Sequence, residues 1–360
     1  MRQPVFISLV VVLFLVARCT AASAAWKFAV ISDSRGGMDM TTGSDHGVRV
    51  SVLAPIAESM AAEGVDMVLF PGDQVDGDPK YGTMKEQLFV WKKAMEPVYK
   101  AGIPVYAFRG NHETKQAGCL EDWDVVFLEL PTNGPNGQKE LTYSIDHKNA
   151  RFVGFDQYVG RPSTFDEKQY DSRINYGMVH QWVIQQITST PTPWVFVFGH
   201  EPAFIVHHAN GLANAPAERD ALWNALGSKN GVYFCGHDHL YLHHVAPDDK
   251  GNRVHELVVG CGGAPFYPFD NESMNKSLDH GICPTTCFVN AGSTTGVAAN
   301  TNSCGYPPYF GYLVITVDGH AATAEWKAFI NYDSEHWIAP EKPEFRALDT
   351  FIIETATSVR

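Results

Sequence analysis

The sequence predicts an α/β protein in which two mixed sheets are stacked and flanked by helices. Short apolar runs rich in Val, Phe and Leu alternate with segments of helical periodicity, which indicates buried strands covered by helices. Near the C-terminus the pattern changes to two long strand-like runs, and Asp318-Gly319 between them is a hairpin turn signal. Two mixed sheets therefore account for the sequence better than one doubly wound sheet.

The expected elements begin with a strand at WKFAVIS, from Trp26. Four apolar residues then recur with the spacing of one helical face, and Gly64 ends that helix. These four residues are Leu53, Ile56, Ala57 and Met60. The elements that follow are, in order, a strand at MVLFPGD, a helix through 88–95 that bends at Pro97 and ends at Gly102, a strand at VYAFRGN, a hairpin of 143–145 with 152–155, a helix near 178–187, a strand at WVFVFGH, a helix near 217–226, strands at VYFCGHD and LVVGCGG, and the hairpin of YFGYLVITVDG with AATAEWKAFI.

The first 24 residues differ from the rest. Arg2 precedes an apolar run at 4–17, and Ala22-Ser23-Ala24 supplies the small residues of a cleavage site, as is typical of a secretory signal peptide. The apolar run is short for a membrane span, although an uncleaved anchor is the alternative. We expect a secreted or periplasmic protein with no integral membrane segment after cleavage. Residues 25–360 would form one domain with a loop insertion around 267–308.

The formal charge of −13 and the cysteine count limit the function further. Such an acidic surface repels polyanions, and the sequence contains no visible basic cluster. We therefore expect no nucleic-acid binding. Six cysteines follow the predicted signal peptide, at 119, 235, 261, 283, 287 and 304. An exported protein can form disulfides, and we expect a local pairing among the last three. Cys235 and Cys261 end strand-like runs, where buried thiols are equally consistent. The sequence does not indicate an oligomeric state.

Polar clusters follow five of the apolar runs at the points where the predicted strands end. The clusters are Asp33-Ser34-Arg35, Gly72-Asp73-Gln74-Val75-Asp76, Gly110-Asn111-His112-Glu113, Gly199-His200-Glu201 and Gly236-His237-Asp238-His239. Because the carboxyl ends of the strands in an open α/β sheet meet at one crevice, we expect these side chains to lie together. Mixed carboxylate and imidazole donors suit Mn, Fe or Zn, and a donor count above four predicts two divalent or trivalent ions.

In order and spacing, these motifs resemble those of the calcineurin-like metallophosphoesterase superfamily over about residues 26–263. The resemblance implies a four-layer βαββ-type sandwich of two mixed sheets flanked by helices, with the last hairpin in the second sheet. It also implies hydrolysis of a phosphomonoester or phosphodiester, on a small molecule or a peptide, by a dinuclear metal centre with a metal-bridging hydroxide. The motifs are specific for the superfamily, but they do not identify the substrate.

The resemblance also assigns roles to individual residues. The implied metal ligands are the bridging carboxylate Asp73, then Asn111, His200 and His237 of one site, and Asp33 and His239 of the other. His112 would contact the substrate and act as the general acid that protonates the leaving oxygen, oriented by Asp76.

Arg35 departs from the superfamily pattern, which begins Asp-x-His with the histidine as a metal ligand. Arginine stays protonated and cannot bind a metal. The first metal site, that of Asp33 and His239, should therefore lack one protein donor. Three interpretations remain open: Arg35 binds the phosphoryl oxygens of the substrate, or it points outward to an acid such as Asp39, or the first metal site is too weak to fill. The alternative function is therefore an exported metal-binding protein whose catalysis is impaired or lost.

Overall fold

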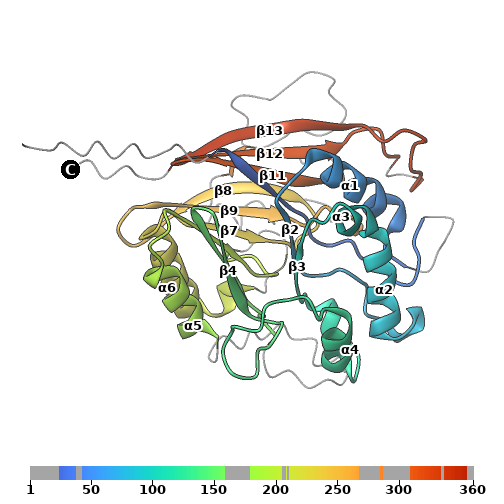
Figure 1. The fold of residues 1–360 in the computed structure, drawn as a ribbon, viewed down its shortest axis with the longest axis horizontal. Coiled ribbons are helices and arrows are strands. Elements are labelled where there is room, and N and C mark those ends of the chain that lie inside the picture. Colours follow the sequence, from blue (N-terminus) through green and yellow to red (C-terminus); the bar gives the residue numbers. More distant parts are fainter. Residues whose placement is uncertain are drawn as a thin grey trace, which may run out of the picture.

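Two sheets lie face to face and carry helices on their outer sides (Figure 1). The computed structural model describes residues 24–37, 43–158, 179–204, 208, 211–266, 284–286, 309–333 and 336–354. Residues 1–23 of the predicted signal peptide and most of the predicted insertion at 267–308 lie outside the described residues. Among the helices that the structure describes, none is long and apolar enough to cross a membrane.

The first sheet has the order β13-β12-β11-β1-β2-β3. Its strands are β1 (Trp26–Val30), β2 (Met67–Pro71), β3 (Val105–Phe108), β11 (Gly311–Asp318), β12 (Ala321–Phe329) and β13 (Phe345–Glu354). Strands β1, β2 and β3 are parallel, whereas β11, β12 and β13 pair antiparallel. The predicted hairpin at Asp318-Gly319 thus joins β11 to β12, with Asp318 opposite Ala321.

The second sheet has the order β10-β8-β9-β7-β6-β5-β4. Its strands are β4 (Tyr143–His147), β5 (Ala150–Gly154), β6 (Trp194–Phe198), β7 (Val232–Cys235), β8 (Tyr241–Pro247), β9 (Arg253–Val259) and β10 (Pro284–Thr286). Strands β5, β6, β7 and β9 are parallel and the outer strands antiparallel. The prediction of two mixed sheets flanked by helices is therefore confirmed.

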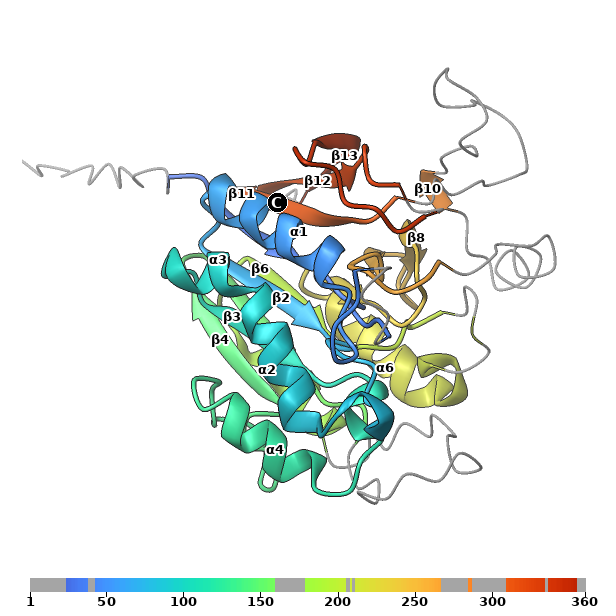
Figure 2. The same ribbon diagram turned by 90° about the vertical axis from the view of Figure 1, so that its right-hand side faces the viewer.

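The helices cover the outer faces of the two sheets, as the rotated view shows (Figure 2). Their bounds are α1 (Val50–Glu63), α2 (Met84–Ala94), α3 (Glu96–Lys100), α4 (Cys119–Val126), α5 (His180–Ser189) and α6 (Pro216–Gly227). Helix α1 buries the predicted apolar face, and Gly64 ends it in the left-handed conformation at φ 66°. The helix expected to bend at Pro97 is instead two helices, α2 and α3, that are separated at Met95. Pro97 lies in the first turn of α3, because its ring nitrogen cannot continue the α2 hydrogen bonds.

Aromatic side chains fill the space between the sheets. The Phe28 ring on β1 lies 5.1 Å from that of Phe152 on β5 and 4.9 Å from that of Phe196 on β6. Such contacts fix one sheet over the other and so fix the ends of their strands. Cys119, Cys235 and Cys261 are buried free thiols, while the three cysteines expected to pair locally lie outside the described residues.

The N-terminus of α2 carries a capping box. The Thr83 hydroxyl accepts the Glu86 N–H at 3.2 Å, and the Glu86 carboxylate accepts the Thr83 N–H at 2.8 Å. We expect Thr83→Ala to lower the free energy of unfolding by about 1 kcal/mol, because the Glu86 N–H loses its acceptor and the Glu86 carboxylate loses the hydrogen bond from the Thr83 hydroxyl. Urea unfolding monitored by circular dichroism measures this change. Thr83→Ser keeps the hydroxyl and should stay near wild type; equal losses in both variants would contradict the capping role.

Candidate metal centre

The strand ends of both sheets place the predicted ligands together. Asp33 follows β1, Asp73 follows β2, Asn111 follows β3, and the histidines follow β6 and β7. All six are buried: Asp33, Asp73, Asn111, His200, His237 and His239. Direct contacts link these residues. The side chains of the strand-end motifs thus lie together in the fold, as their positions in the sequence led us to expect.

Three of these residues adopt a backbone conformation that side chains normally avoid. The φ angles of Asp33, Asp73 and His237 are 60°, 52° and 67°, in the left-handed region. Each costs on the order of 1 kcal/mol, and such residues concentrate at functional sites. Hydrogen bonds hold the main chain in these conformations. The His237 N–H donates to the Asp33 carboxylate at 3.0 and 3.2 Å, and the Asp33 N–H donates to the Gly72 carbonyl at 3.2 Å.

Two glycines of the motifs are required by close approach. A Cβ at Gly110 would overlap the Asp73 carboxylate, and a Cβ at Gly236 would overlap that of Asp33. Neither glycine has a positive φ. These two glycines leave room for the carboxylates, whereas Gly72, at φ 95°, turns the backbone sharply at the end of β2.

One set of donors, the His200 set, consists of Asp73, Asn111, His200 and His237. The Nδ1 of His200 lies 2.8 Å from the Pro71 carbonyl, which can only accept, so Nδ1 carries the proton and Nε2 has the lone pair. This Nε2 faces two further acceptors, Asn111 Oδ1 at 3.1 Å and Asp73 Oδ1 at 3.3 Å. Burial lowers the pKa of His200, which keeps the ring neutral.

Three acceptors thus face one another in the His200 set without a proton between them. The His237 ring lies 5.1 Å from the His200 ring. A cation is the group that satisfies such an arrangement, and the fixed His200 tautomer is the usual orientation of a metal-binding imidazole. The residues present therefore fit a metal ion with oxygen and nitrogen ligands.

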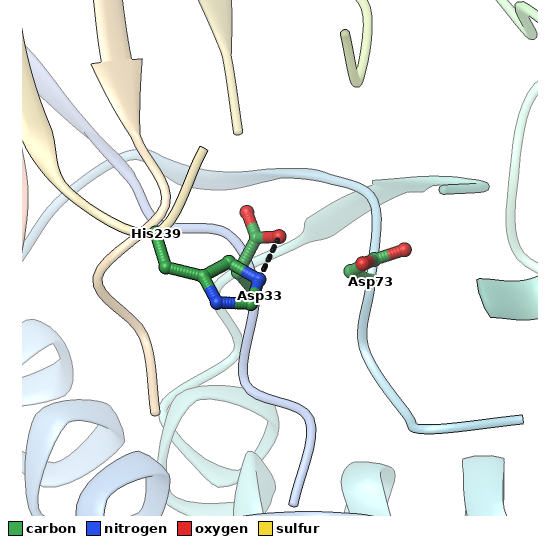
Figure 3. Close-up of side chains that lie close together, drawn as sticks. All are labelled: Asp33, Asp73 and His239. Atoms are coloured by element: carbon green, nitrogen blue, oxygen red, sulfur yellow. Dashed lines mark ion pairs between the residues drawn. The ribbon is translucent and has the colours of Figure 1, made fainter. Parts of the chain in front are cut away.

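The other set of donors, the Asp33 set, consists of Asp33, Asp73 and His239 (Figure 3). One ligand atom from each lies within 4.8 Å of the others, and His239 Nε2 is 3.6 Å from Asp33 Oδ1. Burial, followed by repulsion from Asp73, raises the pKa of Asp33 well above its usual range. Two buried carboxylates at this distance need positive charge beside them.

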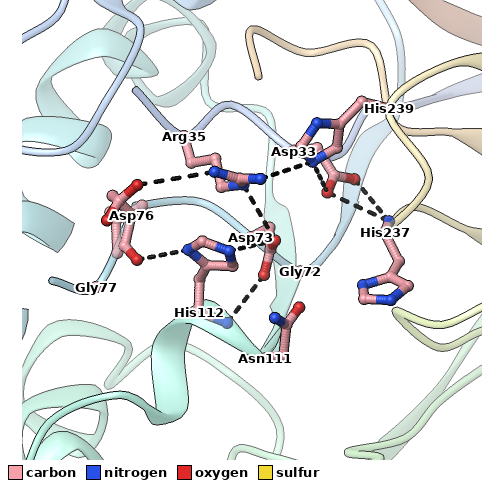
Figure 4. A network of polar contacts seen from close by, with 12 residues as sticks. Asp33, Arg35, Gly72, Asp73, Asp76, Gly77, Asn111, His112, His237 and His239 are labelled. Carbon is pink, nitrogen blue, oxygen red and sulfur yellow. Dashed lines mark hydrogen bonds and ion pairs between the residues drawn. The ribbon is translucent and has the colours of Figure 1, made fainter. Parts of the chain in front are cut away.

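The guanidinium of Arg35 supplies positive charge at the Asp33 set (Figure 4). Its Nε lies 3.6 Å from Asp73 Oδ2 and its Nη1 3.7 Å from Asp76 Oδ2. Its Nη2 lies 3.3 Å from His239 Nε2. Because His239 Nδ1 donates to the Pro265 carbonyl at 2.6 Å, Nε2 has the lone pair and accepts from Arg35. Of the three interpretations, the structure thus places Arg35 inward, while Asp39 lies outside the described residues.

The two residues predicted as catalytic lie beside this cluster. His112 is buried, its N–H donates to Asp73 Oδ1 at 3.1 Å, and its Nε2 lies 3.7 Å from Asp73 Oδ2. Asp76 orients the ring through its main-chain oxygen, 2.5 Å from His112 Nδ1, and not through its carboxylate, which faces Arg35 and Lys115. Burial, followed by Arg35 and Lys115, holds the pKa of His112 well below its ordinary value.

Two residues near the centre, Glu113 and Lys115, were not assigned roles by the sequence. Glu113 is fully buried and accepts the N–H groups of Gly110, Asp73 and Val75 at 2.7, 3.0 and 3.1 Å, so it fixes two of the motifs to each other. Lys115 donates to the Asp76 carbonyl at 2.9 Å, and its pKa is lowered by burial. Lys115 lies three residues after His112, and this spacing is the feature of the sequence that could have placed it beside that histidine.

The sequence leaves two interpretations of His208 open, a residue that lines the substrate mouth or a solvated loop residue. The structure places its ring 4.4 Å from that of His237, and its Nδ1 lies 2.6 Å from Asp238 Oδ1. It therefore supports His237 from the outside. Its neighbour His207 lies outside the described residues.

Comparisons with known proteins agree with this geometry. A family model described as calcineurin-like phosphoesterase matches residues 27–241. No curated protein matches the sequence. Among solved structures, the fold is similar to that of the purple acid phosphatase PPD1 from yellow lupin (Lupinus luteus) seeds, with a TM-score of 0.57 and 16% identity, over 92% of this chain and 54% of that one. It is also similar to PhoD, with a TM-score of 0.60 and 14% identity over 93% and 70% of the two chains.

A third solved structure is GAP50, the anchor in the inner membrane complex of Plasmodium, with a TM-score of 0.52 and 14% identity over 92% and 90% of the two chains. The present chain spans about half the length of the lupin protein, 54%. At these identities the solved structures show the shared fold alone. The family match is different, because it comes from the sequence, covers more than half of the chain and includes all five strand-end motifs. The chain belongs to the calcineurin-like phosphoesterase family.

Proposed function

We propose that the chain hydrolyses phosphate esters with metal bound at the strand ends. The observation that carries this proposal is the His200 set, in which the lone pair of His200 faces the acceptor oxygens of Asn111 and Asp73 at 3.1 and 3.3 Å. Membership of the family implies a dinuclear metal site, and the buried Asp33 set is present as well. Mn, Fe and Zn are the metals that this mixture of donors favours.

Residues around the centre would divide the work of hydrolysis. A metal ion in the His200 set would supply Lewis-acid activation of water and of the phosphoryl group. Arg35, with 18% of its side chain exposed, can reach phosphoryl oxygens from the opposite side of Asp73. His112 presents Nε2 toward the same space and would carry the proton to the leaving oxygen, while Lys115 adds positive charge there.

The substrate class follows from this chemistry, and we propose a phosphomonoester or phosphodiester on a small molecule or a peptide. The formal charge of −13 disfavours nucleic acid as the natural substrate. The predicted signal peptide at residues 1–24 would place the reaction outside the cytoplasm, in the periplasm or the medium.

Metal removal tests the proposal. Dialysis of the purified protein against a strong chelator should abolish hydrolysis of an aryl phosphate, and Mn²⁺, Zn²⁺ or Fe²⁺ should restore it, because the proposed reaction needs the bound ion as the Lewis acid for water and the phosphoryl group. The measurement is the release of the chromogenic phenol together with the metal content. Hydrolysis that continues in metal-free protein would contradict the proposal.

A second candidate function is favoured by Arg35. A cation within 3.6 Å of Asp73 and 3.3 Å of His239 changes the Asp33 set, and loss of turnover would leave an exported metal-binding protein on the same fold. GAP50, whose fold is similar, is described as an anchor. A panel of phosphomonoesters and phosphodiesters, tested with metal-reconstituted protein, separates the two functions: bound metal with no hydrolysis would favour the second.

A further inference from the structure

We infer that Arg35 takes the place of one of the family's two metal ions. The chain would then hold a single ion, in the His200 set, and the guanidinium would supply the positive charge at the Asp33 set. This inference rests on the proposed metal-dependent function and specifies how its centre is built.

The imidazoles of His200 and His239 are held by the same kind of hydrogen bond, but their lone pairs face different kinds of partner, acceptors at His200 and a donor at His239. In both, Nδ1 donates to a main-chain carbonyl, that of Pro71 for His200 and that of Pro265 for His239. Both therefore present the lone pair of Nε2 to the centre. The His200 lone pair faces the acceptor oxygens of Asn111 and Asp73, at 3.1 and 3.3 Å, and such an arrangement calls for a cation. The His239 lone pair faces the Arg35 guanidinium, a donor, at 3.3 Å.

One lone pair cannot serve a guanidinium and a metal ion at the same time. An imidazole nitrogen binds zinc at about 2.0–2.1 Å along the direction of its lone pair, which at His239 is the direction of Arg35. The other side of the guanidinium lies 3.6 Å from Asp73, so Arg35 contacts two of the three residues of the Asp33 set. The Asp33 set therefore does not fit a metal ion while Arg35 keeps this position.

The position of Arg35 is fixed by its surroundings. Its main chain forms an antiparallel bridge with Val48, and its Nη1 lies 3.7 Å from the Asp76 carboxylate. The guanidinium thus contacts Asp73, Asp76 and His239 on different sides (Figure 4). Unlike a metal ion, it cannot dissociate or lose its charge, and its fork of donors matches the oxygens of a phosphoryl group. The site would hold one permanent cation and one exchangeable one.

Metal stoichiometry tests this inference without reference to activity. The mature wild-type chain, reconstituted with Mn²⁺ and freed of excess metal, should contain one ion per chain by mass spectrometry of the metal and show the electron paramagnetic resonance of isolated Mn²⁺. Arg35→His should contain two ions and show the signal of an exchange-coupled pair, because the imidazole is a ligand and removes the competing charge. Arg35→Lys, which keeps the charge and cannot bind metal, should still contain one.

Two ligand variants identify the set that is occupied. His200→Ala in the wild-type background should lose the ion, whereas His239→Ala in that background should keep it. In the Arg35→His background, His239→Ala should remove only the second ion. Two ions in the wild type, none at all, or loss of the single ion in His239→Ala would overturn the inference.

The same experiments test the proposed function separately from the replacement of a metal ion by Arg35. One ion per chain without hydrolysis of any ester would support the replacement by Arg35 and overturn the proposed enzyme activity. Two ions with metal-dependent hydrolysis would support the activity and overturn the replacement.

Discussion

Asp73→Asn should lower kcat/KM for an aryl phosphate by more than 100-fold and release the bound metal. Loss of a hydrogen-bond partner behind a metal ligand already costs about 10–100-fold, so loss of a carboxylate ligand itself should cost more. Asp73 is central because its two oxygens lie near His200, at 3.3 Å, and near Arg35, at 3.6 Å. Asparagine has the same shape and can still accept the His112 N–H, so the protein should stay folded.

The measurement combines steady-state kinetics with metal content and thermal unfolding. Asp349→Asn is the matched control, because Asp349 is also a buried aspartate, accepts a hydrogen bond from Tyr241 at 2.7 Å and lies on β13 of the first sheet, outside the cluster. It should leave hydrolysis and metal content unchanged. An Asp73→Asn variant that is folded and hydrolyses at the wild-type rate would exclude Asp73 from the centre.

The parts of the fold that sequence periodicity predicted are those with one clear environment. Helix α1 buries one regular face, and the β11–β12 hairpin has an unambiguous turn. Strand β8, by contrast, lies between β9 and β10 and contains two adjacent histidines, so its buried residues do not read as an apolar run. Strand β13 is an edge strand with most side chains at least partly exposed, and α4 has only eight residues, too few to show a helical period.

The candidate site was predictable in its residue types and not in its contacts. Asp33, Asp73 and the others could be grouped because each follows a buried strand, and parallel strands bring their ends together. The direction of Arg35 could not be predicted, since it depends on the left-handed turn at Asp33, φ 60°, and on the bridge to Val48, which lies thirteen residues later. For the same reason the sequence could not show that Asp76 contacts His112 through its main chain.

Removing one partner of the buried Arg109–Asp156 pair should strongly destabilise the fold. Arg109 Nη2 donates to Asp156 Oδ2, and their side chains are 5% and 0% exposed. Asp156→Ala should lower the free energy of unfolding by about 3–5 kcal/mol, because the guanidinium is then buried without its counter-charge. Urea unfolding of the metal-free protein measures the loss.

The Arg109 position links stability to the site. Arg109 directly follows β3 and Asp156 follows β5, so the pair joins the first sheet to the second one residue before Gly110-Asn111. Asp146→Ala is the matched control, because Asp146 pairs with Arg151 on the surface at 2.6 and 2.7 Å, is 53% exposed, and should change stability by less than about 1 kcal/mol. The double variant Arg109→Met/Asp156→Leu should recover most of the stability lost in Asp156→Ala, since no buried charge remains. Equal losses in the buried and surface variants would mean that Arg109 tolerates burial without Asp156, and that the two sheets are held at this point by packing alone.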